Sequence, residues 1–174
     1  MTREIRWEYL RSATDAAMKS LVIVFSYHHG NTAKVAGAIA GVLSAEIKEP
    51  KQVHSAELDA YDLVGFGSGI YDEKHHTSLL DLVDSLPPVK DRKAFIFSTC
   101  SLTDATQLAK QHSILRDKLL SKGYTVIGEF SCRGFNTNSF LRHFGGMNKG
   151  RPNPEDLSNA QEFAGDLKRK MRAM

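Results

Sequence analysis

The chain has 174 residues, which is enough for one domain with a sizeable core and too few for two ordinary domains. Hydrophobic residues make up 41% and charged residues 25%, which is typical of a soluble globular protein and excludes a disordered chain. No apolar run approaches the roughly 20 residues that span a bilayer, and the first residues lack the apolar stretch of a secretory signal. Two cysteines exclude a disulfide framework. We therefore expect a cytoplasmic protein that does not associate with membranes.

The net charge of +3 is distributed unevenly along the chain. Residues 1–86 carry 8 Lys/Arg and 12 Asp/Glu (net −4), whereas residues 87–174 carry 15 and 8 (net +7). The basic excess is sharpest between residues 131 and 154, where no acid stands beside Arg133, Arg142, Lys149 and Arg151. Such a segment is either a solvated loop or a surface that attracts phosphates or acidic partners. No motif for groove reading accompanies it, so nucleic acid is not an expected partner.

Strand and helix patterns alternate from residue 20 onward. Apolar and β-branched runs predict strands at 21–25, 63–67, 94–97 and 124–130, with a weaker strand within 45–53. Apolar residues at helical spacing predict helices over 35–43, 79–86, 108–120 and 154–167, the last capped by Asn153 with acids in its first turn. The alternation predicts a doubly wound α/β domain, with a parallel sheet and helices on both faces.

Two segments fit this pattern less well. Residues 1–18 have no clear period, and we interpret them as an N-terminal extension that packs outside the domain of residues 19–174 or mediates association. Residues 131–153 form a long connection that contains three phenylalanines. Connections of this length in compact domains are often functional or contain a short helix, for which 139–144 is the candidate.

Ligands of open α/β sheets bind beyond the carboxyl ends of the strands. The loops at these ends begin at Ser26, Ser68, Ser98 and Ser131. The first loop, residues 26–32, runs from a buried strand into a helix, so its hydroxyls, its amide and the free N–H groups of the helix start can face one anion. It contains no Lys or Arg, which leaves two interpretations: phosphate binding through dipoles, or an ordinary strand–helix turn.

Several other chemistries lack their motifs. The chain has neither G-x-G-x-x-G nor G-x-x-x-x-G-K-[ST], which argues against dinucleotide binding of the Rossmann type and against a nucleotide hydrolase. Phe66 stands where the nucleophile elbow G-x-S-x-G requires glycine. A response-regulator receiver would need acids after the first strand, and a cysteine phosphatase would need cysteine near residue 26.

The motifs that remain resemble those of the flavodoxin family. The loop 26–32 is similar to the phosphate loop [ST]-x-[ST]-G-x-[ST], with one more residue before the glycine. Residues 58–71, LDAYDLVGFGSGIY, resemble the run that leads into a flavin loop, and residues 145–157 resemble a bacterial and archaeal branch of the family. The likeness covers about residues 20–170. It implies a short-chain, flavodoxin-like domain with a five-stranded parallel sheet in the order 2-1-3-4-5.

The same resemblance implies an FMN site. The residues it would place at the FMN phosphate are Ser26, His28, His29, Gly30, Asn31 and Thr32. Those on either side of the isoalloxazine would be Ser68, Gly69, Ile70 and Tyr71, and Ser98, Thr99, Cys100 and Ser101, with Tyr71 as the stacking aromatic. Gly69 would let a peptide bond reorient on flavin reduction, since a positive φ costs glycine little.

We expect no acid–base catalytic residues and no metal, because the redox chemistry of a flavin belongs to the cofactor. His75 and His76 are adjacent and lack a nearby partner, so we interpret them as solvated. Cys100 and Cys132 follow neighbouring strands, where their thiols either approach each other or are two idle buried residues.

Three functions stay open. The first is an FMN-binding electron-transfer protein that works with a redox partner protein. The second is an FMN-dependent NAD(P)H:acceptor oxidoreductase of the quinone type, in which Arg133 or Arg142 would meet the nucleotide phosphate. The third is a flavodoxin-like domain without FMN that acts as a binding module. Typical flavodoxins are strongly acidic, so a basic carrier would need a different partner surface or would use the acids within residues 46–86.

Overall fold

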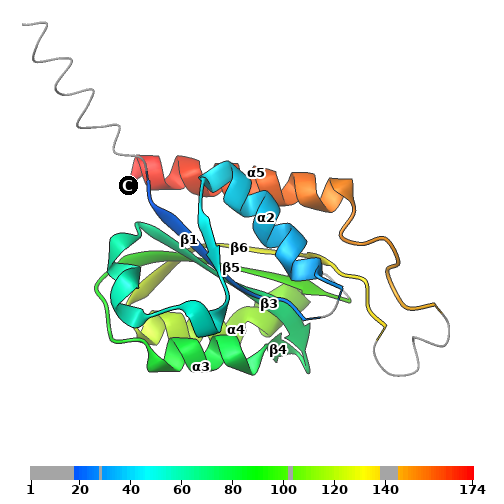
Figure 1. Cartoon of the computed structure of the whole chain (residues 1–174), viewed down its shortest axis with the longest axis horizontal. Helices are drawn as coiled ribbons and strands as arrows, with labels where there is room; N and C mark the ends of the chain where they lie inside the picture. The colour runs from blue at the N-terminus through cyan, green and yellow to red at the C-terminus, as the bar shows by residue number, and fades with distance from the viewer. Residues whose placement is uncertain (1–17, 28, 102–103, 138–144) are drawn as a thin grey trace, which may run out of the picture.

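The computed structural model describes residues 18–27, 29–101, 104–137 and 145–174. In these residues five parallel strands form one sheet in the order β2-β1-β3-β5-β6, and the short strand β4 pairs with the end of β3 in the antiparallel sense (Figure 1). The strands are β1 (Ser20–Phe25), β2 (Glu46–Lys48), β3 (Leu63–Tyr71), β4 (Lys74–His75), β5 (Arg92–Cys100) and β6 (Tyr124–Arg133). Counted over the parallel strands, the order is 2-1-3-4-5, so the predicted doubly wound fold is confirmed.

In the described residues, two α-helices lie on each face of the sheet. Figure 1 shows α2 (Asn31–Leu43) and α5 (Pro154–Ala173) on one face, and α3 (Thr77–Ser85) and α4 (Ala105–Ser121) on the other. The 3-10 helices η1 (Pro50–Gln52) and η2 (Ser55–Ala60) connect β2 to β3. Because side chains alternate along a strand, each face has its own buried core. None of the helices in the described ranges is long and apolar enough to cross a membrane.

Two glycines in the central strand β3 leave room for aromatic rings of the neighbouring strand β5. A Cβ on Gly65 would lie 2.2 Å from the Phe95 ring, and a Cβ on Gly67 would lie 2.2 Å from the Phe97 ring. Both phenylalanines are fully buried beneath α2 and α5. The two glycines of this Gly-x-Gly therefore allow the Phe95 and Phe97 rings to pack against β3.

The final helix begins as the sequence predicts. The Asn153 side chain accepts a hydrogen bond from the backbone N–H of Asp156 over 2.9 Å, and the Asp156 carboxylate accepts one from the backbone N–H of Asn153 over 2.8 Å. This capping box satisfies two backbone donors of the first turn. Arg151 Nη1 also contacts the Asp156 carboxylate at 2.7 Å, so Arg151 is engaged in an ion pair.

The strands differ in length from the sequence-based boundaries. β3 and β5 continue three or four residues past the predicted ends at 67 and 97, because the ladder persists to the pair Gly69↔Thr99 although the residues there are polar. β2 covers only 46–48 of the predicted 45–53. Residues 1–17 of the proposed extension and the candidate helix at 139–144 lie outside the described residues.

The interpretation of His75 and His76 as solvated is wrong. The β3–β4 hairpin turns through Asp72 and Glu73, which both have positive φ (48° and 62°), the conformation of a two-residue type I′ turn. The hairpin places His75 inside the protein, with 1% of its surface exposed. His76 is half-buried and caps α3 by accepting a hydrogen bond from the Ser78 backbone N–H.

The two cysteines do not face each other. Cys132 pairs with Thr99 and Cys100 pairs with Arg133, so the alternation of strand side chains places the two thiols on opposite faces of the sheet. Both are buried and neither forms a disulfide. Burial chiefly raises the pKa of the Cys132 thiol to about 12.

Candidate functional site at the carboxyl edge of the sheet

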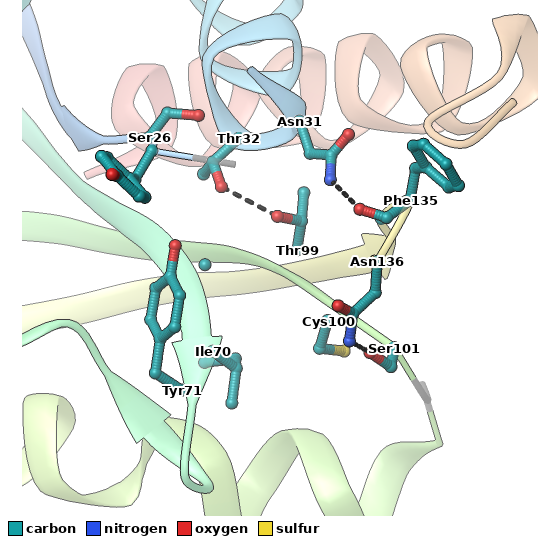
Figure 2. A pocket seen from close by; sticks show the side chains of 13 residues that line it. Ser26, Asn31, Thr32, Ile70, Tyr71, Thr99, Cys100, Ser101, Phe135 and Asn136 are labelled. Atoms are coloured by element: carbon teal, nitrogen blue, oxygen red, sulfur yellow. Dashed lines mark hydrogen bonds between the residues drawn. The ribbon is translucent and has the colours of Figure 1, made fainter. Parts of the chain in front are cut away.

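A pocket opens beyond the carboxyl ends of β1, β3, β5 and β6, where a doubly wound sheet binds its ligands (Figure 2). Its wall comprises Ser26, Tyr27, Asn31, Thr32, Gly69, Ile70, Tyr71, Thr99, Cys100, Ser101, Gly134, Phe135 and Asn136. Most of the polar groups on this wall are hydroxyls and amides, and none of its described residues is Lys, Arg, Asp or Glu.

The amino terminus of α2 faces this pocket. Gly30, at φ 64°, provides the left-handed conformation that starts the helix and contributes no side-chain cap. The first turn contains no acid. Ser26 Oγ accepts a hydrogen bond from the Ala33 backbone N–H over 3.2 Å. A helix start without acidic side chains presents backbone N–H groups and the positive end of the helix dipole, which together favour an anion.

Asn31 and Thr32 connect this helix start to two other strands. Asn31 Nδ2 donates to the carbonyl oxygen of Phe135 over 2.8 Å, and the hydroxyls of Thr32 and Thr99 lie 2.8 Å apart (Figure 2). Asn31 Oδ1 is buried and has no hydrogen-bond partner among the residues that the structure describes. A buried acceptor without a partner is costly, so this atom is suited to a ligand that donates a hydrogen bond.

Tyr71 forms the wall on the side of β3. A Cβ on Gly69 would lie 3.1 Å from the Tyr71 ring and hydroxyl, so the absence of a side chain at Gly69 leaves room for the ring. The Tyr71 ring also contacts His76 edge-on at 5.5 Å, and His76 stacks on Phe25 at 3.8 Å. Burial raises the pKa of Tyr71, so its phenol is neutral at ordinary pH. Figure 2 shows the Tyr71 ring beside the pocket.

The opposite wall is fastened by amide side chains. Asn136 Nδ2 donates to Ser101 Oγ and Asn148 Nδ2 donates to the Ser101 carbonyl, both over 2.8 Å. The backbone N–H of Gly134 donates to the Cys100 carbonyl over 2.9 Å. These bonds hold the segment after β6 against the end of β5, which fixes the distance between this wall and Tyr71.

Nine of the fourteen residues proposed from the sequence lie on the pocket wall: Ser26, Asn31, Thr32, Gly69, Ile70, Tyr71, Thr99, Cys100 and Ser101. His29 is turned toward the segment after β6, where its Nε2 lies 2.8 Å from Thr137 Oγ1 and its ring contacts Phe135. Gly30 precedes the helix without lining the pocket. His28 lies outside the described residues.

Ser68 and Ser98 lie on the other side of the sheet, away from the pocket. Each is fully buried inside a strand that continues past it. Ser98 Oγ contacts His112 of α4, and Ser68 Oγ contacts His75 of β4. The alternation of strand side chains therefore places Thr99 in the pocket and Ser98 beneath it.

Four wall residues were not identified from the sequence: Tyr27, Gly134, Phe135 and Asn136. Three of them follow β6, which ends at Arg133 and not at the predicted residue 130. The sequence did contain one signal for these three residues: the loop that begins at Ser131 is the fourth loop at the carboxyl end of a strand. Gly134 is required there because a Cβ would lie 2.9 Å from Asn31 Nδ2.

The fold and this site define a flavodoxin-like α/β protein, and the comparisons agree. The family description "Flavodoxin domain" matches residues 22–136, and the chain belongs to this family. It is similar to an uncharacterized protein of Methanocaldococcus jannaschii, with 44% identity over 147 residues that cover 84% of this chain and 96% of that protein.

Solved structures show the same fold. Oxidised flavodoxin 2 from Bacillus cereus superimposes with a TM-score of 0.64 at 19% identity, covering 87% of this chain and 99% of that chain. The Fusobacterium nucleatum flavodoxin bound to flavin mononucleotide gives 0.60 at 11% identity, covering 88% and 99%. No group of three or more metal-ligating side chains occurs in the part of the chain that the structure describes.

Proposed function

We propose that the chain binds one FMN in this pocket and transfers electrons through it to and from a redox partner protein. The observation that carries the proposal is the combination of an acid-free helix start, an unpartnered Asn31 Oδ1 and an aromatic wall at Tyr71 in one pocket. The flavin-bound relative from Fusobacterium nucleatum supports the choice of ligand.

The residues present fit the parts of FMN. The start of α2 suits the phosphate, because its N–H groups donate and its dipole is positive. Asn31 Oδ1 is an acceptor, which suits a ribityl hydroxyl and not the phosphate oxygens. Tyr71 and the Thr99–Ser101 segment would lie on either side of the isoalloxazine. FMN would supply the electron storage, and the protein would supply binding, orientation and exclusion of water.

The basic segment of residues 131–154 is compatible with a carrier and with an enzyme. Of its four basic residues, Arg151 is paired with Asp156, Arg133 and Lys149 are exposed, and Arg142 lies outside the described residues. Two exposed cations suit an acidic partner surface through long-range attraction. They also suit the phosphate of a pyridine nucleotide, so an NAD(P)H:acceptor oxidoreductase is the second candidate.

Anaerobic reduction of the FMN-loaded protein separates these functions. A carrier stays oxidised for minutes in excess NADPH and is reduced within seconds once a flavodoxin reductase is added. Rapid bleaching by NADPH alone would establish the enzyme instead. The double variant Arg133→Ala/Lys149→Ala should slow reduction by the reductase, and the slowing should vanish at high salt, where screening removes the attraction. A protein that never takes up FMN would leave only the third candidate, a binding module.

A further inference from the structure

A chain of hydrogen bonds runs from the surface between α4 and β6 to the floor of the pocket. Arg116 Nη2 donates to Glu129 Oε2 over 2.7 Å, and His112 Nδ1 lies 3.0 Å from the same oxygen. His112 Nε2 lies 2.8 Å from Ser98 Oγ. Ser98 Oγ then donates to Ser131 Oγ over 2.9 Å, and Ser131 Oγ lies 3.5 Å from Cys100 Sγ. Cys100 lines the pocket.

The polarity of these bonds places a proton on His112 Nδ1. Burial opposes ionisation of Glu129, but the bonds from Arg116 and His112 outweigh it and lower the pKa of Glu129 to about 2, so this carboxylate only accepts. His112 Nδ1 must therefore donate to it. Ser98 Oγ donates to Ser131, so His112 Nε2 can donate to Ser98 in turn.

Groups from several elements pack around His112. Glu129 of β6 contacts its Nδ1, and Arg116 of α4 binds the same carboxylate. His75 of β4 packs against the His112 ring at 4.9 Å. The strand β5 contributes the Ser98 hydroxyl. On α3, Asp84 forms an ion pair with Lys118, and the charge of Asp81 interacts with His76.

His75 is the neutral neighbour of His112. Ser68 Oγ lies 2.9 Å from His75 Nδ1, and His75 Nε2 is buried without a partner among the described residues. Burial, together with the charge of His112, lowers the pKa of His75 well below its ordinary value.

We propose that His112, Ser98, Ser131 and Cys100 form a proton relay between the Arg116–Glu129 ion pair and the pocket. In one direction, the Nε2 proton of His112 passes to Ser98, the Ser98 proton passes to Ser131, and the Ser131 proton passes to the Cys100 thiolate. The products are neutral His112 and the Cys100 thiol. Each serine hydroxyl then donates in the opposite direction, and the total number of protons is unchanged. Cys100 at the pocket floor therefore shares one proton with His112.

This relay differs from a hydrolytic triad although the order Ser98–His112–Glu129 has the same pattern. Ser98 is fully buried, so no substrate reaches its hydroxyl. Its role is to pass a proton and not to attack a substrate. Cys100 is the member with access to the pocket. The relay does not depend on FMN, and it can be tested in the protein before any cofactor is added.

The test uses the FMN-free protein with Cys132→Ala, so that Cys100 is the single thiol. Its alkylation rate by iodoacetamide is measured against pH in three further backgrounds: Ser131→Ala, which breaks the relay; Ser131→Thr, which restores a hydroxyl; and Ser113→Ala. The control hydroxyl of Ser113 lies on α4 and donates to the Lys110 carbonyl. Circular dichroism confirms that each variant is folded.

We expect Ser131→Ala to raise the apparent pKa of Cys100 by about one unit, which is about a tenfold loss of thiolate at neutral pH. Ser131→Thr should recover most of the rate, and Ser113→Ala should match the parent. Equal pH profiles for Ser131→Ala and Ser113→Ala would overturn the relay. These outcomes do not depend on flavin, so a protein that fails to bind FMN can still support them.

Nitrogen-15 NMR of the histidine rings provides a second measurement on the unmutated chain. Blocking Cys100 with iodoacetamide should change the ring-nitrogen shifts of His112, because the relay joins the two groups through Ser98 and Ser131. His112 shifts that do not respond to the block would contradict the relay even if Ser131→Ala does not fold.

Discussion

Asn31 Nδ2 donates a hydrogen bond to the carbonyl oxygen of Phe135 and so ties the first turn of α2 to the segment after β6. The two residues are 104 positions apart in sequence. The same amide leaves Oδ1 buried and unpartnered at the pocket wall. Asn31 therefore has a structural role through its nitrogen, and in the proposed site its oxygen would accept a hydrogen bond from the ligand.

Replacing Asn31 with Ala should weaken FMN binding. The substitution removes the acceptor for a ribityl hydroxyl and releases the Phe135 carbonyl, which together should cost on the order of 2 kcal/mol, or about thirtyfold in Kd. Fluorescence titration of FMN measures the change. Asn159→Ala on the exposed face of α5 is the matched control. Equal affinities for the two variants would show that Asn31 does not contact the ligand.

Gly67→Ala should destabilise the fold. Its Cβ would lie 2.2 Å from the fully buried Phe97 ring, and overpacking of this kind costs about 1 to 3 kcal/mol. Urea unfolding gives the loss directly. Gly37→Ala in α2, where a Cβ meets open space, should instead stabilise the protein by about 0.5 to 1 kcal/mol. Adding Phe97→Leu should recover part of the loss from Gly67→Ala, and a failure to do so would place the strain elsewhere.

The Glu129 carboxylate makes stability depend on pH in the acid range. Its pKa falls from 4.5 to about 2 on folding, so its ionisation stabilises the protein above about pH 4.5 and this contribution is lost as the pH falls toward 2. The loss should be on the order of 2 kcal/mol. Melting temperatures from pH 7 down to the acid limit should fall more steeply for the parent than for Glu129→Gln. Parallel curves would show that Glu129 is not the group responsible.

Gly69→Ala should change the electronic environment of the bound flavin. A Cβ there would lie 3.1 Å from the Tyr71 ring, so the ring must shift, and an alanine resists the positive φ that a reoriented peptide needs. The one-electron reduction potential of the FMN-loaded protein should shift, as an anaerobic spectroscopic titration would measure. Gly41→Ala, where a Cβ meets open space on α2, controls for the added methyl group. An unchanged potential in Gly69→Ala would rule out a role for this glycine.

Much of the fold could be predicted because its signals are local. The buried strands, the helical periods and the Asn153 cap each occupy a short stretch of sequence, and the alternation of elements then determines the layers. The flavin loops resemble known motifs for the same reason. The nine wall residues predicted from the sequence all lie in or next to such stretches.

The remaining residues could not be predicted because their positions depend on strand register. Ser68 and Ser98 are adjacent in sequence to pocket residues, yet the continued strands direct their side chains to the opposite face. His75 is polar and follows a turn, but the hairpin places it in the core. Asn136 reaches the pocket through a segment that only the full sheet can position. A one-residue shift in the pairing register would move every side chain of a strand to the other face of the sheet.

The most direct test of the central claim is a titration of the purified, flavin-free protein with FMN, followed by flavin fluorescence and visible absorption. We expect saturable binding of one FMN per chain, with quenching by the Tyr71 wall and a resolved flavin spectrum. Riboflavin, which lacks the phosphate, should bind at least about tenfold more weakly, since the start of α2 then loses its anion. No saturable uptake of FMN would contradict the proposed site and leave the chain as a flavodoxin-family domain that does not bind FMN.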